Sequence, residues 1–439
     1  MISAARGIGG QPQPNDRDSL AKSHHGCCGE PGNASTRADM NLLAVHTVCG
    51  LHEHLGGPSR SVPGLCGALK SCGVDAQIVS VQLRGEGLTC TPFNVRTVLV
   101  PGRRYPALRQ VISLGFPSVL RTQLAATRDV VLHDHGLWLL PNQQAISVAR
   151  RRQVPAVVSP RGMLSKWALD ENRLLKQAAW LAFQRRNLCR ASVIHATSTS
   201  EAADIRSLID TPISIVPNGV HMPADAVESC RRSGMPRTAL FLSRLHKVKG
   251  LELLIEAWAR VRPDGWRLVV CGAGSPDYTG RLKRLVQDSG ILDLVSFEGN
   301  VAGKAKEKLF AGADLFVLPT LSENFGLAVA EALSWGIPVI TTRGAPWHEL
   351  EEYRCGWWTA IGVQPVAEAL RAATSMPSEA LAAMGRRGQE LIRRKYSWAA
   401  VARQMVEVYH WTVSGGHVPP SMDNEFNIGT AAASSSRVR

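Results

Sequence analysis

The chain has 439 residues, of which 45% are hydrophobic and 20% charged, and a formal net charge of +14. It is too long for one core of usual size, so two domains of a globular protein are expected. No run approaches the roughly 18 apolar residues of a membrane-spanning helix, and the N-terminus lacks the apolar core of a signal peptide, which favours the cytoplasm. Ten cysteines without C-x-x-C spacing favour buried thiols over disulfides or zinc.

The N-terminal segment, residues 1–39, is rich in Gly, Pro, Ser and Asn and has almost no apolar periodicity. We expect it to be disordered. Met40 stands directly before the first strand pattern, so a chain that began there would begin where the fold begins. The leading segment is therefore expected to be dispensable.

After Met40, short apolar runs alternate with helical patterns, which is typical of parallel α/β units. In the first half, strands are expected at 41–48, 76–82, 95–100, 129–134, 154–159, 192–197 and 212–216. In the second half, they are expected at 237–243, 266–272, 293–298, 314–319, 337–342 and 356–360. This pattern predicts two doubly wound domains, with ligands at the carboxyl ends of the strands.

The domain boundaries follow from composition. Pro, Gly, Ser and Asp gather between Pro217 and Pro236, so we place the two domains at 40–218 and 219–395. Ser397 is the expected N-cap of a last helix that runs to about Trp411, within a segment at 396–413. Residues 414–439 contain Gly and Ser clusters and are expected to be disordered.

Two stretches carry much of the positive charge. Residues 101–128 hold five arginines and no acid, and residues 148–190 hold ten basic residues against Asp170 and Glu171. Both also carry large apolar side chains, as do basic amphipathic segments that lie on an anionic membrane surface. Helices with a solvated basic face and a core-facing apolar face explain either pattern equally well. No recognition motif for nucleic acid accompanies the charge, so no nucleic-acid partner is expected.

The stretch SENFGLAVAEAL, from Ser322 to Leu333, follows a strand-like run at 314–319. Gly326 stands where a helix would begin, and the first amides of a helix lack intrahelical partners, which suits an anion. Glu323 lies just before that start and Glu331 about two turns into the helix. The two carboxylates could hold hydroxyls on either side of a bound phosphate, as a sugar nucleotide requires, although such pairs also occur on ordinary solvated helices.

A second motif, FLSRLHKVKG, ends at Gly250 and places Arg244 and Lys249 in a short loop between a strand and a helix. Arg offers a planar fork to phosphate oxygens and Lys a point charge. Together the two motifs resemble the nucleotide-sugar site of retaining glycosyltransferases of family 4. That family has the α/β fold called GT-B, in which two Rossmann-like doubly wound domains face each other across a cleft and a C-terminal helix crosses back to the N-terminal domain. The resemblance covers roughly residues 40–412.

The resemblance implies a role for residues of both domains in binding the donor. Glu331 would accept hydrogen bonds from the ribose hydroxyls, and Glu323 would hold hydroxyls of the transferred sugar. Backbone amides would line that sugar or reach the diphosphate, glycines would leave room for the nucleotide, and main-chain groups would grip the base. These further positions are Phe325, Gly326, Leu327, Gly56, Gly57, Gly272, Asn300 and Val301.

Two histidines, His133 and His135, end the strand expected at 129–134. Their alternation with Asp134 points the three side chains to opposite sides of a strand, so no metal site is expected. By resemblance, the second histidine faces the cleft and donates toward the transferred sugar, which selects His135. Arg161, in SPRGML, is similar to a position in transferases that build bacterial surface polysaccharides. It could meet an acceptor phosphate or form a structural ion pair.

The implied function is retaining transfer of a sugar from a nucleoside-diphosphate sugar to a saccharide acceptor. The resemblance suggests a lipid-linked acceptor in polysaccharide biosynthesis, such as that of lipopolysaccharide or exopolysaccharide, with the protein cytoplasmic and peripheral at the inner membrane face. His135, Glu323, Arg244 and Lys249 would be catalytic. We expect front-face displacement without a protein nucleophile, cofactor or metal, since no Asp-x-Asp triplet or comparable carboxylate pair is placed to hold a metal on a diphosphate. A soluble acceptor, a nucleotide-sugar epimerase of this fold and a non-catalytic subunit remain alternatives.

Overall fold

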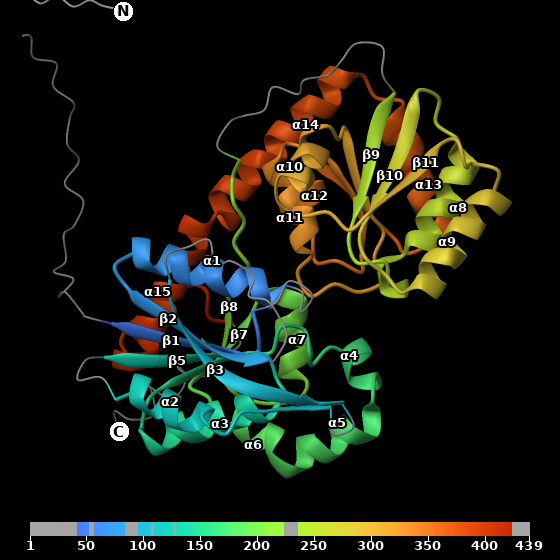
Figure 1. Cartoon of the computed structure of the whole chain (residues 1–439). Helices are drawn as coiled ribbons and strands as arrows, with labels where there is room; N and C mark the ends of the chain where they lie inside the picture. Colours follow the sequence, from blue (N-terminus) through green and yellow to red (C-terminus); the bar gives the residue numbers. More distant parts are fainter. Residues whose placement is uncertain are drawn as a thin grey trace, which may run out of the picture. The chain divides into compact units, whose positions relative to one another are not determined.

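A computed structural model describes residues 42–51, 57–83, 95–106, 109–125, 129–223 and 236–423. Two sheets organise them, of eight and six strands (Figure 1). The inner strands of both, such as β1, β5, β12 and β13, are rich in apolar residues and buried on both faces, as expected of parallel sheets covered by helices, whereas β3, β11 and β14 are partly exposed. The structure therefore confirms two doubly wound domains.

The first sheet has the order β4-β3-β2-β1-β5-β6-β7-β8. Its strands are β1 (Leu43–Val48), β2 (Asp75–Leu83), β3 (Arg96–Tyr105), β4 (Gln110–Ile112), β5 (Val130–His135), β6 (Ala156–Ser159), β7 (Val193–Ala196) and β8 (Ile213–Ile215). The helices of this half are α1 (Pro58–Ser71), α2 (Phe116–Gln123), α3 (Leu140–Arg151), α4 (Lys166–Asp170), α5 (Arg173–Ala179), the π-helical η3 (Trp180–Gln184), α6 (Arg185–Leu188) and α7 (Thr199–Arg206).

The second sheet has the order β11-β10-β9-β12-β13-β14. Its strands are β9 (Arg237–Leu242), β10 (Trp266–Cys271), β11 (Val295–Gly299), β12 (Leu315–Leu318), β13 (Val339–Thr342) and β14 (Gly356–Thr359). The helices are the 3₁₀ turn η4 (Lys247–Lys249), α8 (Leu251–Val261), α9 (Pro276–Asp288), α10 (Gly303–Ala311), α11 (Leu327–Ser334), α12 (Glu349–Glu352), α13 (Val363–Thr374), α14 (Ser378–Leu391), the π-helical η5 (Ile392–Tyr396) and α15 (Trp398–Ser414).

Each strand expected from the sequence is present. The one unexpected strand is β4, a three-residue segment that pairs antiparallel with the end of β3 through Arg103–Ile112, Arg104–Val111 and Tyr105–Gln110. This pairing also extends β3 five residues beyond its expected end. A three-residue edge strand carries too few side chains to show a period of two, so its sequence pattern could not distinguish it from a turn.

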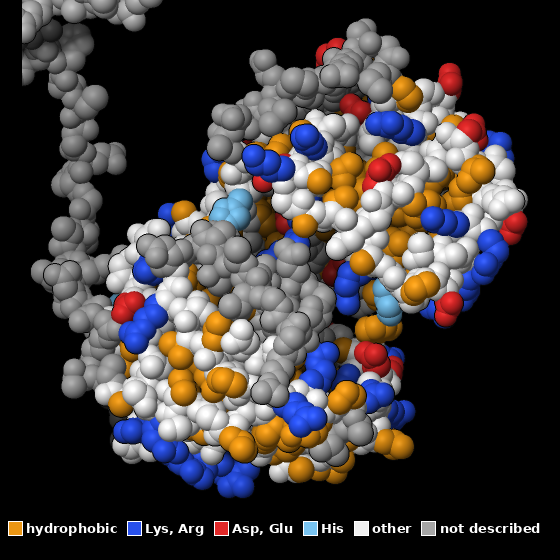
Figure 2. All heavy atoms as spheres, in the orientation of Figure 1, with side chains coloured by type: hydrophobic (Ala, Val, Ile, Leu, Met, Phe, Trp, Pro, Cys, Tyr) orange, Lys and Arg blue, Asp and Glu red, His pale blue; other side chains and the backbone are white. Residues whose placement is uncertain are grey.

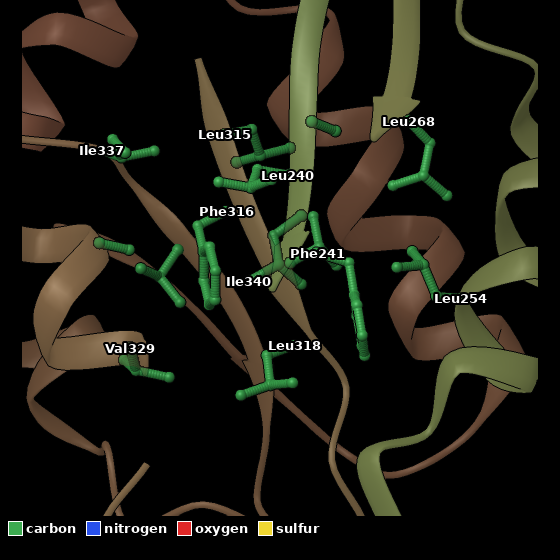
Figure 3. Close-up of a cluster of buried hydrophobic side chains, with 14 of the residues drawn as sticks. Leu240, Phe241, Leu254, Leu268, Leu315, Phe316, Leu318, Val329, Ile337 and Ile340 are labelled. Atoms are coloured by element: carbon green, nitrogen blue, oxygen red, sulfur yellow. The ribbon is translucent and has the colours of Figure 1, made fainter. Parts of the chain in front are cut away.

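The core of the second half lies between its sheet and the helices that cover it. Figure 3 shows Leu240 and Phe241 of β9 beside Leu315 and Phe316 of β12, all of them buried. Val329 of α11 belongs to the same apolar cluster. The helix that begins at the predicted anion site is therefore anchored in this core.

The last helix, α15, packs on the first sheet, as the sequence predicted. Ser397 is its N-cap, and the Ser397 hydroxyl accepts a hydrogen bond from the amide of Ala400 at 3.3 Å. Met405 and Tyr409 are fully buried in an apolar cluster with residues of β1 and β5 and with α1. No helix among the described residues is long and apolar enough to cross a membrane.

Residues 414–423 correct one expectation. The amide of Ile215 donates to the carbonyl of Ser421 at 2.7 Å, and that of Asp423 to Ile213 at 2.9 Å, so this segment adds to β8. Met422 is 2% exposed and joins the core. Disorder was expected from residue 414 because of the Gly and Ser clusters, and this is wrong for 414–423, where backbone pairing and one buried side chain fix the chain.

The chain passes between the two halves at two places, which lie side by side. The amide of Val220 donates to the carbonyl of Tyr396 at 2.9 Å, and Val220 forms a parallel bridge with Ser397. The Trp398 ring packs against Gly64 of α1 and against Gly219, where an added Cβ would come within 2.2 Å of the indole. Glycine is needed at both positions because any side chain would displace this ring.

Candidate functional site

The loops that follow β9, β10 and β11 are bonded to one another at the carboxyl edge of the second sheet. The amide of Leu245 donates to the carbonyl of Ala273, and the amide of Gly272 donates to Gly299, both at 2.7 Å. An added Cβ on Gly272 would lie 1.7 Å from the carbonyl oxygen of Ser243. Gly272 is therefore required by the packing of these loops, whereas the sequence interpretation assigned it to the nucleotide.

The loops after β9, β12 and β13 are joined in the same way. The amide of Leu321 donates to Val248, and that of Glu323 donates to Gly344, both at 2.7 Å. Gly250, with φ of +67°, packs so closely that an added Cβ would lie 2.0 Å from the carbonyl oxygen of Pro319. These contacts place the two motifs found in the sequence, around Lys249 and Glu323, at one edge of the sheet.

Lys249 and Glu323 form an ion pair between the Lys249 ammonium and Oε1 of the carboxylate. The residue Lys249 is only 8% exposed. Arg244 is exposed, and no hydrogen bond or ion pair to another described residue involves its guanidinium. The site thus holds one neutralised pair and one cation that is open to solvent.

The start of α11 lies directly after Glu323. Gly326 is its N-cap in the left-handed conformation, with φ of +80°, and the helix begins at Leu327 as predicted. The amides of Phe325, Gly326 and Leu327 make no hydrogen bond to another described residue. The carbonyl oxygen of Phe325 accepts from the Trp347 indole at 2.6 Å, which fixes the turn. Three neighbouring amides are therefore available to an anion or a hydroxyl.

Glu331 pairs with a residue that the sequence analysis did not identify. The ammonium of Lys306, on α10, lies 2.6 Å from Oε1 of Glu331. Asn300 is exposed and Val301 half-buried, and both lie in the loop between β11 and α10. Lys306 was missed because it is 25 residues from Glu331 and carries no motif of its own, so only the strand order brings the two together.

On the first sheet, Gly57 is the N-cap of α1, and an added Cβ there would meet nothing within 4 Å. Its role as a diphosphate contact stays a prediction, and Gly56 lies outside the described residues. His135 ends β5 and is 2% exposed. Its Nδ1 lies 3.1 Å from Nη2 of Arg161 and its Nε2 lies 2.9 Å from Nδ1 of His46. In this arrangement neither ring nitrogen is free to donate to a sugar.

Arg161 follows β6 in the left-handed conformation, with φ of +57°. Nη1 donates to Oδ1 of Asn218 at 2.6 Å, and no described carboxylate lies within 4 Å of the guanidinium nitrogens. Burial lowers the pKa of Arg161 to about 10, partly offset by the charge of Glu201, so it is still protonated at neutral pH. A structural ion pair, the alternative considered from the sequence, is therefore not formed in the described part of the chain.

A cluster of histidines surrounds His135. His46, His133 and His135 are buried, and one nitrogen of each lies within 4.8 Å of the others, a spacing that a metal ion could bridge. His195 and Tyr409 extend the cluster through hydrogen bonds. The sequence showed only His133 and His135, because the others lie on different strands and on α15, and their positions depend on strand register. Burial lowers the pKa of His46 and His195 to about 3.

Asp134 points to the opposite face of β5, as its alternation with the histidines predicted. Its carboxyl accepts from the Thr47 hydroxyl at 2.6 Å and from the Asn142 amide at 3.1 Å. Burial raises the pKa of Asp134 to about 7, although both hydrogen bonds oppose the shift. It is not a ligand of the histidine cluster.

Comparison with known proteins identifies both halves of the chain. Residues 227–391 match the family described as glycosyl transferases group 1, and residues 56–219 match the glycosyl transferase 4-like domain. The chain is similar to D-inositol 3-phosphate glycosyltransferase of Pseudarthrobacter chlorophenolicus, with 28% identity over 56% of this chain and 62% of the relative. It is also similar to the putative colanic acid biosynthesis glycosyltransferase WcaL of Salmonella typhimurium, with 26% identity over 45% and 50%.

The fold is shared with solved structures. HepE of Anabaena, in complex with UDP and glucose, superimposes with a TM-score of 0.63 and 18% identity over 83% of this chain and 98% of that chain. WaaG, a glycosyltransferase involved in lipopolysaccharide biosynthesis, gives a TM-score of 0.61 and 17% identity over 85% and 100%. At these identities the likeness establishes the GT-B fold alone. The matched segments span between about half and three fifths of the length of the first curated relatives.

Proposed function

Because the chain belongs to the family 4 glycosyltransferases, we propose that it is a retaining enzyme that transfers a sugar from a nucleoside-diphosphate sugar. The observation that carries the proposal is the arrangement at Glu323. The Lys249 ammonium, its carboxylate partner Glu323 and the three amides of residues 325–327, which have no partner among the described residues, lie at one edge of the sheet on two adjoining loops. A sugar diphosphate needs this combination of hydroxyl acceptors and cationic or N–H donors.

Lys249, Arg244 and the start of α11 would act on the leaving diphosphate. Negative charge grows on it as the bond to the sugar breaks, so these donors stabilise the transition state more than the bound ground state. Oε2 of Glu323 would hold sugar hydroxyls while Oε1 keeps the ammonium in place. Glu331, oriented by Lys306, would accept from the ribose hydroxyls. The departing diphosphate would accept the acceptor's proton, so the reaction is proposed to need neither metal nor cofactor.

Direct evidence would come from the reaction itself. We expect thermal shifts with one of UDP, GDP and ADP and with the matching sugar nucleotide, since a ligand at about 100 times its Kd adds roughly 2.7 kcal/mol of stability. The product's anomeric configuration, read by NMR, should equal that of the donor, and activity should persist in EDTA. Inversion, or dependence on added Mg²⁺ or Mn²⁺, would contradict the proposal. Change of stereochemistry in the donor without any acceptor would indicate an epimerase.

The acceptor is proposed to be a lipid-linked saccharide, met at the inner face of a membrane. The support is a surface formed by α4, α5 and η3, which we call the apolar-basic surface. None of the side chains of α4 and α5 is buried. Four large apolar side chains on it are exposed, at 48%, 83%, 52% and 85%, and these are Trp167, Leu174, Leu175 and Leu181. Figure 2 shows apolar side chains beside Lys and Arg around α5 and α6.

The charge of this surface selects an anionic partner. This surface and the residues that follow it through α6, together residues 166–190, contain six basic side chains against two acidic ones. The positive charge of Arg109 also acts on Lys176. Basic residues near an anionic bilayer contribute about 1 kcal/mol each, and the exposed leucines would enter its interface. If the acceptor were water-soluble, the exposed apolar and basic side chains of this surface would have no evident function.

Vesicle flotation tests the membrane proposal. Binding to phosphatidylglycerol vesicles, but not to phosphatidylcholine ones, is expected, and it should weaken as salt rises. Leu174→Glu with Leu181→Glu should abolish flotation. The matched control is Leu292→Glu, at a site 67% exposed in the second half, which should float like the unaltered protein. Equal flotation of the double variant and the control would contradict a membrane role for this surface.

A further inference from the structure

The buried histidines lie toward the carboxyl ends of β1, β5 and β7, with β6 between the last two strands. His46 on β1 stands opposite His133 on β5, with His135 two residues farther and His195 on β7. Their exposure is 0%, 0%, 2% and 2%, in that order. Helix α15 packs on this sheet and places the Tyr409 hydroxyl among the rings. Because buried imidazole nitrogens need partners, the direction of each hydrogen bond can be worked out.

The first bonds run from Arg161 inward. A guanidinium has only donors, so Nη2 of Arg161 donates to Nδ1 of His135, at 3.1 Å. In a neutral ring with Nδ1 accepting, Nε2 carries the hydrogen. Nε2 of His135 therefore donates to Nδ1 of His46, 2.9 Å away. The same rule makes Nε2 of His46 a donor.

The remaining bonds continue in the same direction. Nε2 of His46 donates to the Tyr409 hydroxyl at 3.3 Å, and that hydroxyl donates to Nδ1 of His133 at 2.6 Å. Nε2 of His133 then donates to Nδ1 of His195 at 3.2 Å, and Nε2 of His195 donates to the carbonyl oxygen of Val216 at 2.8 Å. A carbonyl oxygen can only accept a hydrogen bond, so Nε2 of His195, which the assignment makes a donor, has the partner that it needs.

The two ends fix the whole series, because one has only donors and the other only an acceptor. All four imidazoles must be neutral and carry hydrogen on Nε2, since a protonated ring would bring two donors together. Burial independently lowers the pKa of all four histidines. The Ser159 hydroxyl lies 2.6 Å from Nδ1 of His195 and donates to the carbonyl oxygen of His195 at 3.2 Å, so it is a second polar neighbour of the nitrogen that accepts from His133.

A metal ion is the other reading of the cluster. It would have to displace bonds, since each nitrogen of His46, His133 and His135 already has a partner. It would also lie near the Arg161 cation, and no carboxylate in the described part of the chain accepts a hydrogen bond from any of the three rings. Zinc-ligating histidines usually have such an acceptor on the second nitrogen. The hydrogen-bonded series accounts for every ring nitrogen without an ion.

We propose that Tyr409 is a positioning residue for Arg161, acting through a one-way series of hydrogen bonds that holds the rings of His46 and His135 in place. With hydrogen on Nε2, His135 presents a lone pair to Nη2 of Arg161, while Asn218 holds Nη1. Nε of Arg161 is buried without a partner, and no described carboxylate pairs with the guanidinium. The guanidinium of Arg161 is therefore fixed in position, carries a positive charge and has an N–H donor that is not used, which suits it to bind a phosphate of the substrate. This last step rests on the proposed transferase function, whereas the series itself does not.

The Tyr409 hydroxyl is the only member of the series on α15, and it joins two halves of that series. Tyr409→Phe would leave Nε2 of His46 without an acceptor and Nδ1 of His133 without a donor. Arg161 still offers only donors, so His135 and His46 keep hydrogen on Nε2, but the His46 ring loses the hydrogen bond that holds it. The position of the His135 ring, and with it that of the Arg161 guanidinium, is then less well defined.

Nitrogen NMR of the full chain labelled with ¹⁵N-histidine tests the series directly. At pH 7, signals assigned by single His→Asn variants should show His46, His133, His135 and His195 neutral with hydrogen on Nε2. A ring with hydrogen on Nδ1, a protonated ring, or stoichiometric zinc in the purified protein would overturn the proposal. This measurement needs no activity and no Tyr409 variant, so its outcome is independent of the proposed function.

Kinetics test the positioning role. Tyr409→Phe should lower kcat about tenfold or more, the value of a buried hydrogen bond, with little change in donor KM. Its ¹⁵N spectrum should still show His135 with hydrogen on Nε2, because Arg161 offers only donors. The matched control is Tyr278→Phe, which removes a hydroxyl bonded to Glu252 on the second half and should keep both parameters. Unchanged kcat in folded Tyr409→Phe, or an equal loss in the control, would overturn the positioning role.

Discussion

The Lys249 ammonium and the Glu323 carboxylate are each other's counter-ion in the absence of a donor. Lys249→Ala therefore does two things, since it removes a cation from the diphosphate and leaves Glu323 uncompensated. We expect turnover to fall by about 10²–10³, the usual loss for one preorganised donor. Initial rates at saturating donor measure this.

The control for that variant is Lys247→Ala, which removes an exposed ammonium from the same short turn. It should keep full turnover, because a solvated charge contributes little to either state. Full activity in Lys249→Ala would exclude the ammonium from the leaving-group role, whatever the control shows.

Glu331 and Lys306 form a second ion pair, and only the carboxylate is proposed to touch the donor. Glu331→Ala should raise the donor KM about tenfold or more, since hydrogen bonds to charged groups contribute about 1.5–3 kcal/mol. Lys306→Ala should raise it less, because the carboxylate remains and loses only its orientation. Glu307→Ala, at an exposed position of the same helix α10, should match the unaltered enzyme.

The four buried histidines make stability depend on pH. Burial lowers their pKa, to about 3 for His46 and His195, so below pH 6.5 the unfolded chain binds protons that the folded one does not. Asp134 acts oppositely, because burial raises its pKa to about 7 and the folded chain holds that proton between about pH 4 and 7. The net excess of about three protons in the unfolded state predicts a loss of about 4 kcal/mol per pH unit near pH 5.

Urea unfolding at pH 7.5, 6 and 5 measures this slope. Stability should fall steadily across the series. Stability that stays constant between pH 7 and 5 would show that the histidines are protonated in the folded protein, in conflict with their hydrogen bonds.

At the scale of elements, the turn between β9 and α8 depends on one glycine. Gly250 has φ of +67°, and an added Cβ would lie 2.0 Å from the carbonyl oxygen of Pro319. Gly265 has a similar φ of +70° with nothing within 4 Å of an added Cβ. Gly265→Ala should therefore cost about 1–2 kcal/mol from the backbone alone. Gly250→Ala should cost more than about 3 kcal/mol, because the loop of β12 must also move.

Thermal and urea denaturation of the two variants separates the backbone strain, which both share, from the steric clash with Pro319, which only Gly250→Ala has. Gly250→Ala should also weaken donor binding, since Lys249 precedes it directly. Equal losses in both variants would mean that the close approach to Pro319 is relieved without cost.

Strands and helices whose own residues show an apolar pattern could be predicted from the sequence. Contacts that depend on how distant strands and helices align with one another could not. The runs at 239–242 and 315–318 are apolar throughout, and they lie in the central strands β9 and β12. Lys249 and Glu323 carried motifs and were placed at one edge by the parallel topology. His46 and Tyr409 are 363 residues apart, and only the packing of α15 on β1 brings their side chains together. No pattern within a single sequence encodes that contact.

At the scale of the whole molecule, the apolar clusters separate by half. One comprises residues between Val220 and Tyr396, and the other two comprise residues before 217 together with α15 and Met422. The domain boundaries expected from the sequence, 40–218 and 219–395, stay predictions, but they divide the clusters in the same way. The last helix belongs energetically to the first half, since Met405 and Tyr409 are buried there.

The paired crossings at Val220 and Tyr396 make the second half an inserted domain whose two ends touch. Replacing residues 220–396 by a short flexible linker should leave residues 41–219 and 397–423 able to fold together, because the two ends of the replaced part, Val220 and Tyr396, are hydrogen-bonded to each other and the linker has only this short distance to span. Residues 41–219 alone should aggregate, since they would expose the face that α15 covers. Size-exclusion chromatography and circular dichroism of both chains decide this. An excised protein that stays unfolded would mean that the halves cannot be inherited, exchanged or engineered as separate modules.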